Sequence, residues 1–264
     1  MTALVWDQVG ERVYQTGVDR GVLYLPDGNG VPWNGLVSVE DTPSRETSSF
    51  YLDGIKYLER HSPGDFSGKL TAFTYPDEFD LLNGMFTNGN GMFFTEQSPK
   101  AFGLSYRTLL GDDIAGTERG YKLHLLYNLL ANPDAVAYNS IGAQTDPISF
   151  GWTLTGTPVV VSGVRPTAHV YIDSTKLVPG AIDIIEATLY GSETTAPTLP
   201  PLSDVITLLD ALHFIEIIDN GDGTWTANGP DSLITMLTAT TFQITHANAT
   251  YLDANTYEIS NNQP

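Results

Sequence analysis

The chain has 264 residues, of which 31 are acidic and 12 basic, giving a formal net charge of −19. Such a chain lacks the dense lysine and arginine that a surface binding nucleic-acid phosphates needs, although it can still lie near DNA without holding it. The absence of cysteine excludes disulfide bonds and thiolate metal ligands. The longest apolar runs are far shorter than the ~20 residues of a membrane-spanning helix, and the opening MTALVWDQVGERVYQ does not resemble a secretory signal. We therefore expect a soluble protein.

The first part of the chain is predicted to consist mainly of strands separated by turns. Residues 21–39 read as two strand-forming runs around Pro-Asp-Gly-Asn-Gly, a turn sequence. Residues 40–49 are polar and are expected to form a long exposed loop. YPDEFDLLNG predicts a short helix with Pro76 in its first turn and Gly84 at its end. Further strands are expected at 102–110, 122–130, 150–155 and 169–173.

Apolar and polar residues alternate along residues 66–72, the pattern of a half-buried strand. The apolar set, expected to face the core, is Phe66, Leu70 and Ala72. The polar set, expected on the opposite face, is Ser67, Lys69 and Thr71.

The charge distribution changes near residue 176. Residues 1–176 hold 20 acids and 12 bases, whereas residues 177–264 hold 11 acids and no base. The Thr/Pro-rich GSETTAPTLPPLSD follows, and we place a boundary near Thr198, with a β domain at 1–198 and a small α+β decoration domain at 199–264. In the second domain we expect a helix capped by Ser203, a hairpin turning at 220–223, a helix in PDSLITMLTA and two short strands.

No pattern of catalytic, cofactor-binding or metal-binding residues emerges, so we predict a protein that is not an enzyme. DNGDGT has glycine where a calcium loop needs oxygen ligands, and the five histidines show no metal-ligand spacing. The adjacent acids Asp112–Asp113 and Asp77–Glu78 lie where turns and helix starts favour acids.

The segments YLDGIKYLER, GKLTAFTYPDEFD and FGLSYRTLLGDDIAG, in this order, resemble the major tail tube protein of long non-contractile (siphovirus-type) phage tails, particularly those of phages of actinobacteria. The resemblance spans about residues 6–173. It implies a mainly β, tail-tube-type sandwich or barrel with a short helix and a long loop. It also implies a structural virion protein, assembled in the host cytoplasm, whose hexameric rings stack head-to-tail around a channel for DNA. Its partners would be further copies of itself, the tape measure and tail terminator proteins, and DNA in transit without specific binding; no cofactor or membrane is implied.

An acidic and polar channel would repel DNA rather than hold it. We expect Ser67, Lys69 and Thr71 to face this channel, with Asp53 on the hairpin partner of their strand. The polar loop at 40–49 is expected to order between stacked rings, and its charged members are Asp41, Arg45 and Glu46.

Two other classes of protein fit the sequence less well. A β-sandwich carbohydrate-binding or adhesion module of a tail tip or cell surface would use exposed aromatic residues, for which Trp33, Trp152 and Trp225 are candidates. A glycosidase would need two carboxyl groups at a suitable separation within one pocket.

Overall fold

The computed structural model describes residues 4–42, 47–61, 66–140, 147–177 and 180–213, and after residue 213 the backbone of the strands alone. The chain divides into two compact units. The first comprises residues 1–175 and 197–199, and the second comprises residues 176–196 and 200–264. The fold is mainly β, as the sequence predicts, whereas the domain boundary near Thr198 stays a prediction.

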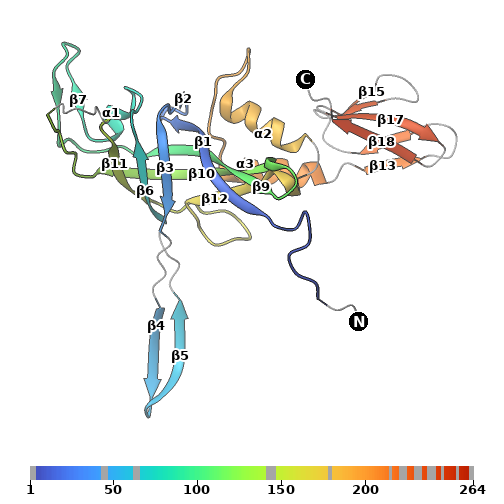
Figure 1. Cartoon of the computed structure of the whole chain (residues 1–264), viewed down its shortest axis with the longest axis horizontal. Coiled ribbons are helices and arrows are strands. Elements are labelled where there is room, and N and C mark those ends of the chain that lie inside the picture. The colour runs from blue at the N-terminus through green and yellow to red at the C-terminus, as the bar shows by residue number, and fades with distance from the viewer. Residues whose placement is uncertain are drawn as a thin grey trace. The chain divides into compact units, whose positions relative to one another are not determined.

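The first unit is built on an eight-stranded antiparallel sheet with the order β2-β1-β9-β10-β11-β6-β3, in which β12 also pairs with β10 (Figure 1). The 18-residue strand β10 is long enough to pair with β11 through residues 129–133 and with β12 through residues 122–126. The strands of this sheet are β1 (Tyr14–Tyr24), β2 (Gly30–Pro32), β3 (Leu36–Asp41), β6 (Phe66–Ala72), β9 (Phe102–Asp112), β10 (Gly116–Pro133), β11 (Phe150–Gly156) and β12 (His169–Asp173). The four strands predicted between residues 102 and 173 are therefore confirmed.

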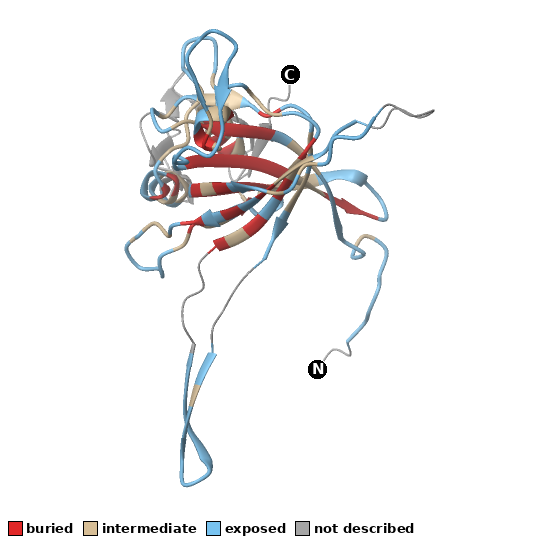
Figure 2. Ribbon diagram, turned by 90° about the vertical axis from the view of Figure 1, so that its left-hand side faces the viewer, coloured by how far each residue is buried: buried red, intermediate tan, exposed pale blue. Residues whose placement is uncertain are grey.

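Aromatic rings fill the core of this unit. The ring of Trp152 lies 5.2 Å from that of Phe79 and 5.8 Å from that of Trp33, centroid to centroid. The short helix α1 (Phe79–Leu82) places both of its terminal side chains in this core, where they are fully buried. In Figure 2 the buried residues follow the strands of the sheet. The predicted helix is confirmed, although it begins three residues after Pro76.

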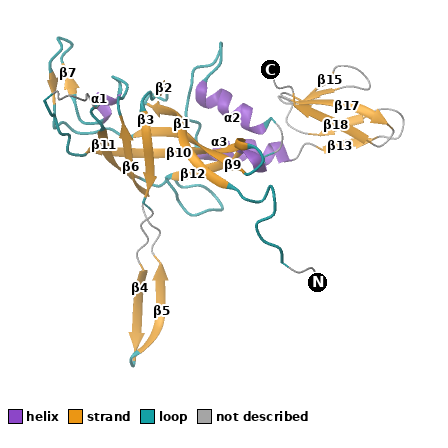
Figure 3. Cartoon of the chain, in the orientation of Figure 1, coloured by secondary structure: helices purple, strands orange, loops and turns teal. Residues whose placement is uncertain are grey.

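Two hairpins complete the first unit. β4 (Thr47–Leu52) pairs with β5 (Ile55–His61), and β7 (Phe86–Thr87) pairs with β8 (Phe93–Phe94) (Figure 3). The expected loop at 40–49 is therefore wrong at both ends, since its first two residues end β3 and its last three begin β4. Residues 40 and 41 pair with Lys69 and Gly68 of β6. Residues 47–49 belong to a hairpin because the Asp53–Gly54 turn has two positive φ angles, 50° and 76°, that suit a tight turn between β4 and β5.

The second unit contains two helices, α2 (Ala181–Tyr190) and α3 (Leu202–His213), which pack through Ala181, Ile184 and Leu208. Helix α2 was not predicted. Helix α3 was, but Ser203 lies inside it and donates a hydrogen bond to Asp204 instead of capping it. None of the helices in the described part of the chain is both long and apolar enough to span a membrane.

The C-terminal strands form two small antiparallel sheets. β13 (Glu216–Asp219) pairs with β14 (Trp225–Asn228), which confirms the predicted hairpin. The other sheet has four strands in sequence order: β15 (Ile234–Met236), β16 (Phe242–Ile244), β17 (Ala247–Asp253) and β18 (Thr256–Asn261). The helix predicted in PDSLITMLTA is wrong, because residues 234–236 of that segment form β15, paired with β16. Strand pairing with the next segment of the chain outweighs a weak local helix preference.

Candidate assembly surfaces

One face of the sheet in the first unit is polar. Along β6 the residues alternate between buried and accessible, with Phe66, Leu70 and Ala72 in the core, as predicted. Residues directly opposite each other on antiparallel strands share a face, so the register carries this alternation to the neighbouring strands. The polar residues on the face opposite the core are Ser38, Glu40, Ser67, Lys69, Thr71, Asn132, Thr153 and Thr155. We call this set the polar face.

Lys69, the cation on the polar face, has a carboxylate partner. Its Nζ lies 2.8 Å from Oδ2 of Asp134, which follows β10 directly. The hydroxyl of Thr153 donates to the other carboxylate oxygen at 3.0 Å, and the Asp134 amide donates to the Gly151 carbonyl. The hydrogen bond and charge of this pair raise the pKa of Lys69 and lower that of Asp134. The lysine therefore adds no uncompensated positive charge to the polar face.

Asp53, one of the predicted lumen-facing residues, lies elsewhere than expected. Asp53 is not on a partner strand of β6, because β6 pairs with β3 and β11, and Asp53 lies in the β4–β5 turn. Alternation in one strand does not reveal which strand pairs with it. Asp41 ends β3, and Arg45 and Glu46 fall outside the described residues.

Two histidines that the sequence treats as unrelated meet in a hydrogen-bonded row. Nδ1 of His169 lies 3.2 Å from the Asp41 carboxylate, and its Nε2 lies 3.0 Å from Nδ1 of His124. Nε2 of His124 lies 3.0 Å from the Thr108 hydroxyl, which accepts a hydrogen bond from the Gln15 amide. Every partner is satisfied when each histidine carries its proton on Nδ1. In the pairing of β10 with β12, His124 lies opposite residue 171 and His169 lies opposite residue 126. The two histidines are therefore diagonal neighbours on one face of the sheet.

Burial holds both histidines in the neutral form. The pKa of His124 is lowered to about 4, mainly by desolvation and to a lesser extent by the charge of the nearby His169. Desolvation also lowers the pKa of His169, although Asp41 opposes that effect. Among the described residues no group of three histidine or carboxylate side chains is placed to hold a metal ion. The row therefore acts as a polar network, buried at His124 and exposed at its two ends, that joins β1, β3, β9, β10 and β12.

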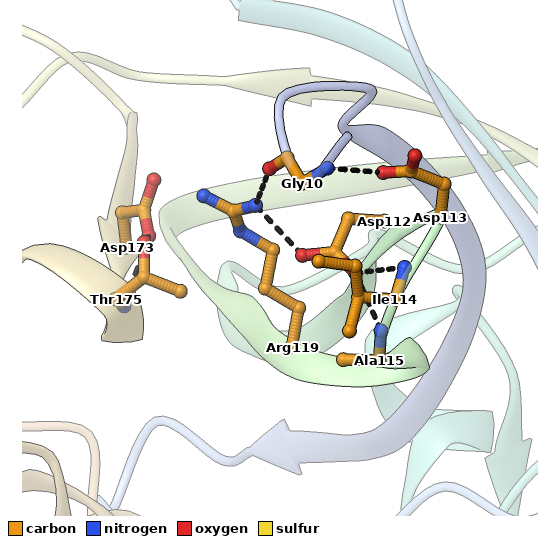
Figure 4. Close-up of polar contacts among 8 residues, drawn as sticks. All are labelled: Gly10, Asp112, Asp113, Ile114, Ala115, Arg119, Asp173 and Thr175. Carbon is orange, nitrogen blue, oxygen red and sulfur yellow. Dashed lines mark hydrogen bonds and ion pairs between the residues drawn. The ribbon is translucent and has the colours of Figure 1, made fainter. Parts of the chain in front are cut away.

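The adjacent acids Asp112 and Asp113 hold a turn and the N-terminal segment (Figure 4). Asp112 accepts hydrogen bonds from the amides of Ile114 and Ala115 and from the Arg119 guanidinium, at 2.6–2.8 Å. These hydrogen bonds lower the pKa of Asp112, and those from the two amides have the largest effect. Asp113 accepts a hydrogen bond from the amide of Gly10. Each carboxylate thus has structural partners, which is the interpretation that the sequence favours.

The other adjacent acids, Asp77 and Glu78, lie beside a groove of about 800 Å³ next to α1. Its apolar lining includes Leu25, Leu81, Leu82, Met85, Phe86 and Phe93. Its charged lining residues are Asp27, Asp77, Glu78, Asp80 and Lys100. Burial, followed by the charge of Asp77, raises the pKa of Asp80. We call this feature the α1 groove. Its residues show no pattern in the sequence that distinguishes them from ordinary turn and helix residues.

Two of the three tryptophans proposed for a carbohydrate-binding surface are in the core. Trp33 and Trp152 are 3% and 2% exposed, and the indole nitrogen of Trp33 donates to the carbonyl of Thr74. The side chain of Trp225 falls outside the described residues. Trp33 and Trp152 therefore do not form an exposed aromatic patch.

No protein-family model and no curated protein sequence matches this chain. Among solved structures, a chain of the PVC sheath–tube complex of an extracellular contractile injection system is 19% identical, with a TM-score of 0.34, covering 56% of this chain and 90% of that one. A chain of the PVC sheath/tube terminator is 17% identical with a TM-score of 0.34, covering 56% and 96%. The cap that terminates the tube of the anti-feeding prophage is 14% identical with a TM-score of 0.35, covering 66% and 100%. TM-scores of this size do not establish a shared fold, so the roles of those proteins are not transferred to this chain.

Proposed function

We propose that this chain is the tail tube subunit of a long, non-contractile phage tail. In this proposal it is a structural virion protein, assembled in the host cytoplasm, whose hexameric rings stack into a tube for DNA passage. Its partners are further copies of itself and the tape measure and tail terminator proteins. The observation that carries the proposal is the polar face, a surface several strands wide that backs directly onto the aromatic core.

The polar face has the chemistry that a DNA channel needs. It presents hydroxyl and amide groups from four strands, and its lysine is paired with Asp134. DNA phosphates therefore meet no track of free cations on it. The remaining net charge of the chain repels DNA over a Debye length of ~10 Å at 0.1 M salt, so DNA would slide without binding. Ser67, Lys69 and Thr71 are the proposed lumen-facing residues of β6.

The edges of the sheet support assembly. The path of paired strands ends at β3 on one side and at β2 on the other, where the amide of Gly30 already donates to the carbonyl of Pro197 and leaves only part of that edge unpaired. Strand edges with unpaired backbone groups are templates for pairing with another chain, and closure of several sheets into one barrel removes them. Subunits that join edge to edge around an axis form a ring, with the polar faces turned toward the lumen.

Negative-stain electron microscopy of the purified full chain tests this function. We expect rings with sixfold symmetry, and tubes at higher protein concentration, with a continuous central channel. A parallel gel-shift measurement should show no retention of double-stranded DNA at physiological salt. A protein that stays monomeric over the whole accessible concentration range, or that binds DNA tightly, contradicts the proposal.

A further inference from the structure

The β4–β5 hairpin has one apolar face. Phe50 lies opposite Leu58, and Leu52 lies opposite Ile55, so the register places all four on one side. Their side chains are 52%, 53%, 60% and 73% exposed for Phe50, Leu58, Leu52 and Ile55 respectively. Alternation also places Arg60 on this side, next along β5 after Leu58. The hairpin therefore presents four large apolar side chains and one cation on a single surface, which we call the apolar hairpin face.

The opposite side of the hairpin combines the exposed Tyr51 with polar and charged residues, and its charges are compensated. The register shift between Phe50 and Tyr51 pairs Tyr51 with Lys56, and the next pair on that side is Ser49 with Glu59. Lys56 and Glu59 form an ion pair. Isolated two-stranded hairpins are marginally stable in water, and a cluster of exposed apolar side chains marks an interaction surface. The hairpin thus offers one face for a partner and one for solvent.

The α1 groove complements that face in polarity and in charge. Its apolar lining can take large aliphatic and aromatic side chains, and its volume of about 800 Å³ suits several of them. Four carboxylates and one amine line it, which leaves an excess of negative charge. Burial, followed by the charge of Asp77, disfavours the ionised form of Asp80, and an arriving cation opposes that effect. Arg60 is the charged residue of the apolar hairpin face, and its sign fits the groove.

The chain places the hairpin and the groove at opposite ends of one strand. β5 ends at His61 and leads into β6 at its first residue, Phe66. After its last residue, Ala72, the chain continues into α1 and the groove. A seven-residue strand spans roughly 23 Å. A second copy displaced along this strand direction therefore brings its hairpin to the groove of the first.

We propose that the apolar hairpin face binds the α1 groove of a second copy, head to tail, with Arg60 against the carboxylates of the groove. The inference rests on the proposed tube function and specifies the contact that stacks one ring on the next. Because the two surfaces differ and lie at opposite ends of a strand, each bound copy leaves one hairpin and one groove unused. Such a contact repeats without closing and generates a filament.

Cysteine cross-linking tests the contact directly, because the natural chain contains no cysteine. Leu52→Cys protein is mixed with Leu81→Cys protein under the conditions in which wild-type tubes form, and the mixture is mildly oxidised. Leu81 lines the groove and is 46% exposed. We expect disulfide-linked heterodimers, and a ladder of longer oligomers from the double variant. Tyr51→Cys, on the polar side of the hairpin, is the matched control and should cross-link to Leu81→Cys several-fold less.

Charge reversal provides a second, independent measurement. Arg60→Glu should raise the protein concentration needed for tube formation by about tenfold or more, equivalent to ~1.4 kcal/mol per contact. Glu78→Arg in the same chain should restore assembly, because the pair is reversed and not removed. Circular dichroism confirms that each variant is folded, which is expected since both residues are exposed.

Three results overturn the inference. In the first, Tyr51→Cys cross-links to Leu81→Cys as well as Leu52→Cys does. In the second, Trp6→Cys from the exposed N-terminal segment gives the main cross-link to Leu81→Cys. In the third, Arg60→Glu protein assembles as the wild type does. If wild-type tubes form and any of these holds, the contact is wrong and the tube function stands. If wild-type protein forms neither rings nor tubes, the tube function itself fails.

Discussion

Leu70 and Thr71 are neighbours on β6 with opposite surroundings. Leu70 is fully buried opposite Trp152 in the core, and Thr71 lies on the polar face opposite Gly151 and Ser38. Two adjacent side chains on this strand are thus surrounded by the apolar core and by water, respectively. Substitutions at these two positions separate folding from channel chemistry.

Leu70→Asp should prevent folding, whereas Thr71→Glu should leave the fold intact. An unpaired carboxylate in the core costs several kcal/mol, which is a large part of the stability of a domain. A glutamate on an accessible face changes the free energy of unfolding by about 0.5 kcal/mol or less. Thermal unfolding of both variants checks this. Folded Leu70→Asp beside unfolded Thr71→Glu would show that the strand faces the other way.

The histidine row predicts a loss of stability with acid. The pKa of His124 is about 4 in the folded chain and about 6.5 when unfolded, so the unfolded chain binds more protons between these values. Stability therefore falls as the pH drops from about 6.5 toward 4, by roughly 3 kcal/mol at most. Urea unfolding at pH 7 and pH 5.5 should show the onset of this loss.

His124→Gln is the control for that measurement. Glutamine keeps a hydrogen-bonding group beside Thr108 and His169 but cannot take up a proton. The difference in stability between pH 7 and pH 5.5 should shrink in this variant. An unchanged difference would mean that carboxylates, not the histidine row, determine the response.

At the scale of elements, the hairpins differ from the main sheet in what covers them. β9 and the middle of β10 are largely buried and pair on both edges, whereas β4 and β5 pair only with each other among the described strands. Exchange of backbone amides with solvent reports this difference, because it follows the free energy of local opening.

Hydrogen exchange at Thr47–Leu52 and Ile55–His61 should be fast in dilute monomer and slow in assembled tubes. The reason is that a two-stranded hairpin opens readily until a partner buries its apolar face. Exchange in β9 and β10 should be slow in both states and serves as the internal reference. Equal exchange of the hairpin in monomer and tube would exclude it from the stacking contact.

At the scale of the whole molecule, the tube function makes the polar face a surface that DNA passes. Replacing Ser67 and Thr71 together by arginine should leave tubes intact, because both positions are accessible. Phage DNA delivery should slow, since each ring then presents a band of cations to the phosphates. The readout is delivery into host cells beside microscopy of the tubes. Replacement of both residues by glutamine is the matched control, and equal delivery by both variants would exclude the face from the channel.

Local patterns in the sequence determined part of this protein by themselves. Alternation along residues 66–72 predicted which side of β6 is buried, because side chains of a strand point to opposite faces in turn. The strands at 102–173 and the turn role of Asp112 followed from similarly local preferences. Asp-Gly at 53–54 carried the signal for the β4–β5 hairpin, although the polar residues before it favoured a loop.

Only the tertiary structure decided which segments meet. Lys69 of β6 pairs with Glu40 of β3, 29 residues earlier in the chain, and with Thr153 of β11, 84 residues later. Asp134 beside Lys69, His124 beside His169, and the α1 groove all depend on such distant pairings. The alternation along a strand indicates which of its faces is exposed to solvent, but it does not indicate which strand pairs with it. The reason is that strand pairing depends on the residues of two segments, which come together only when the chain folds.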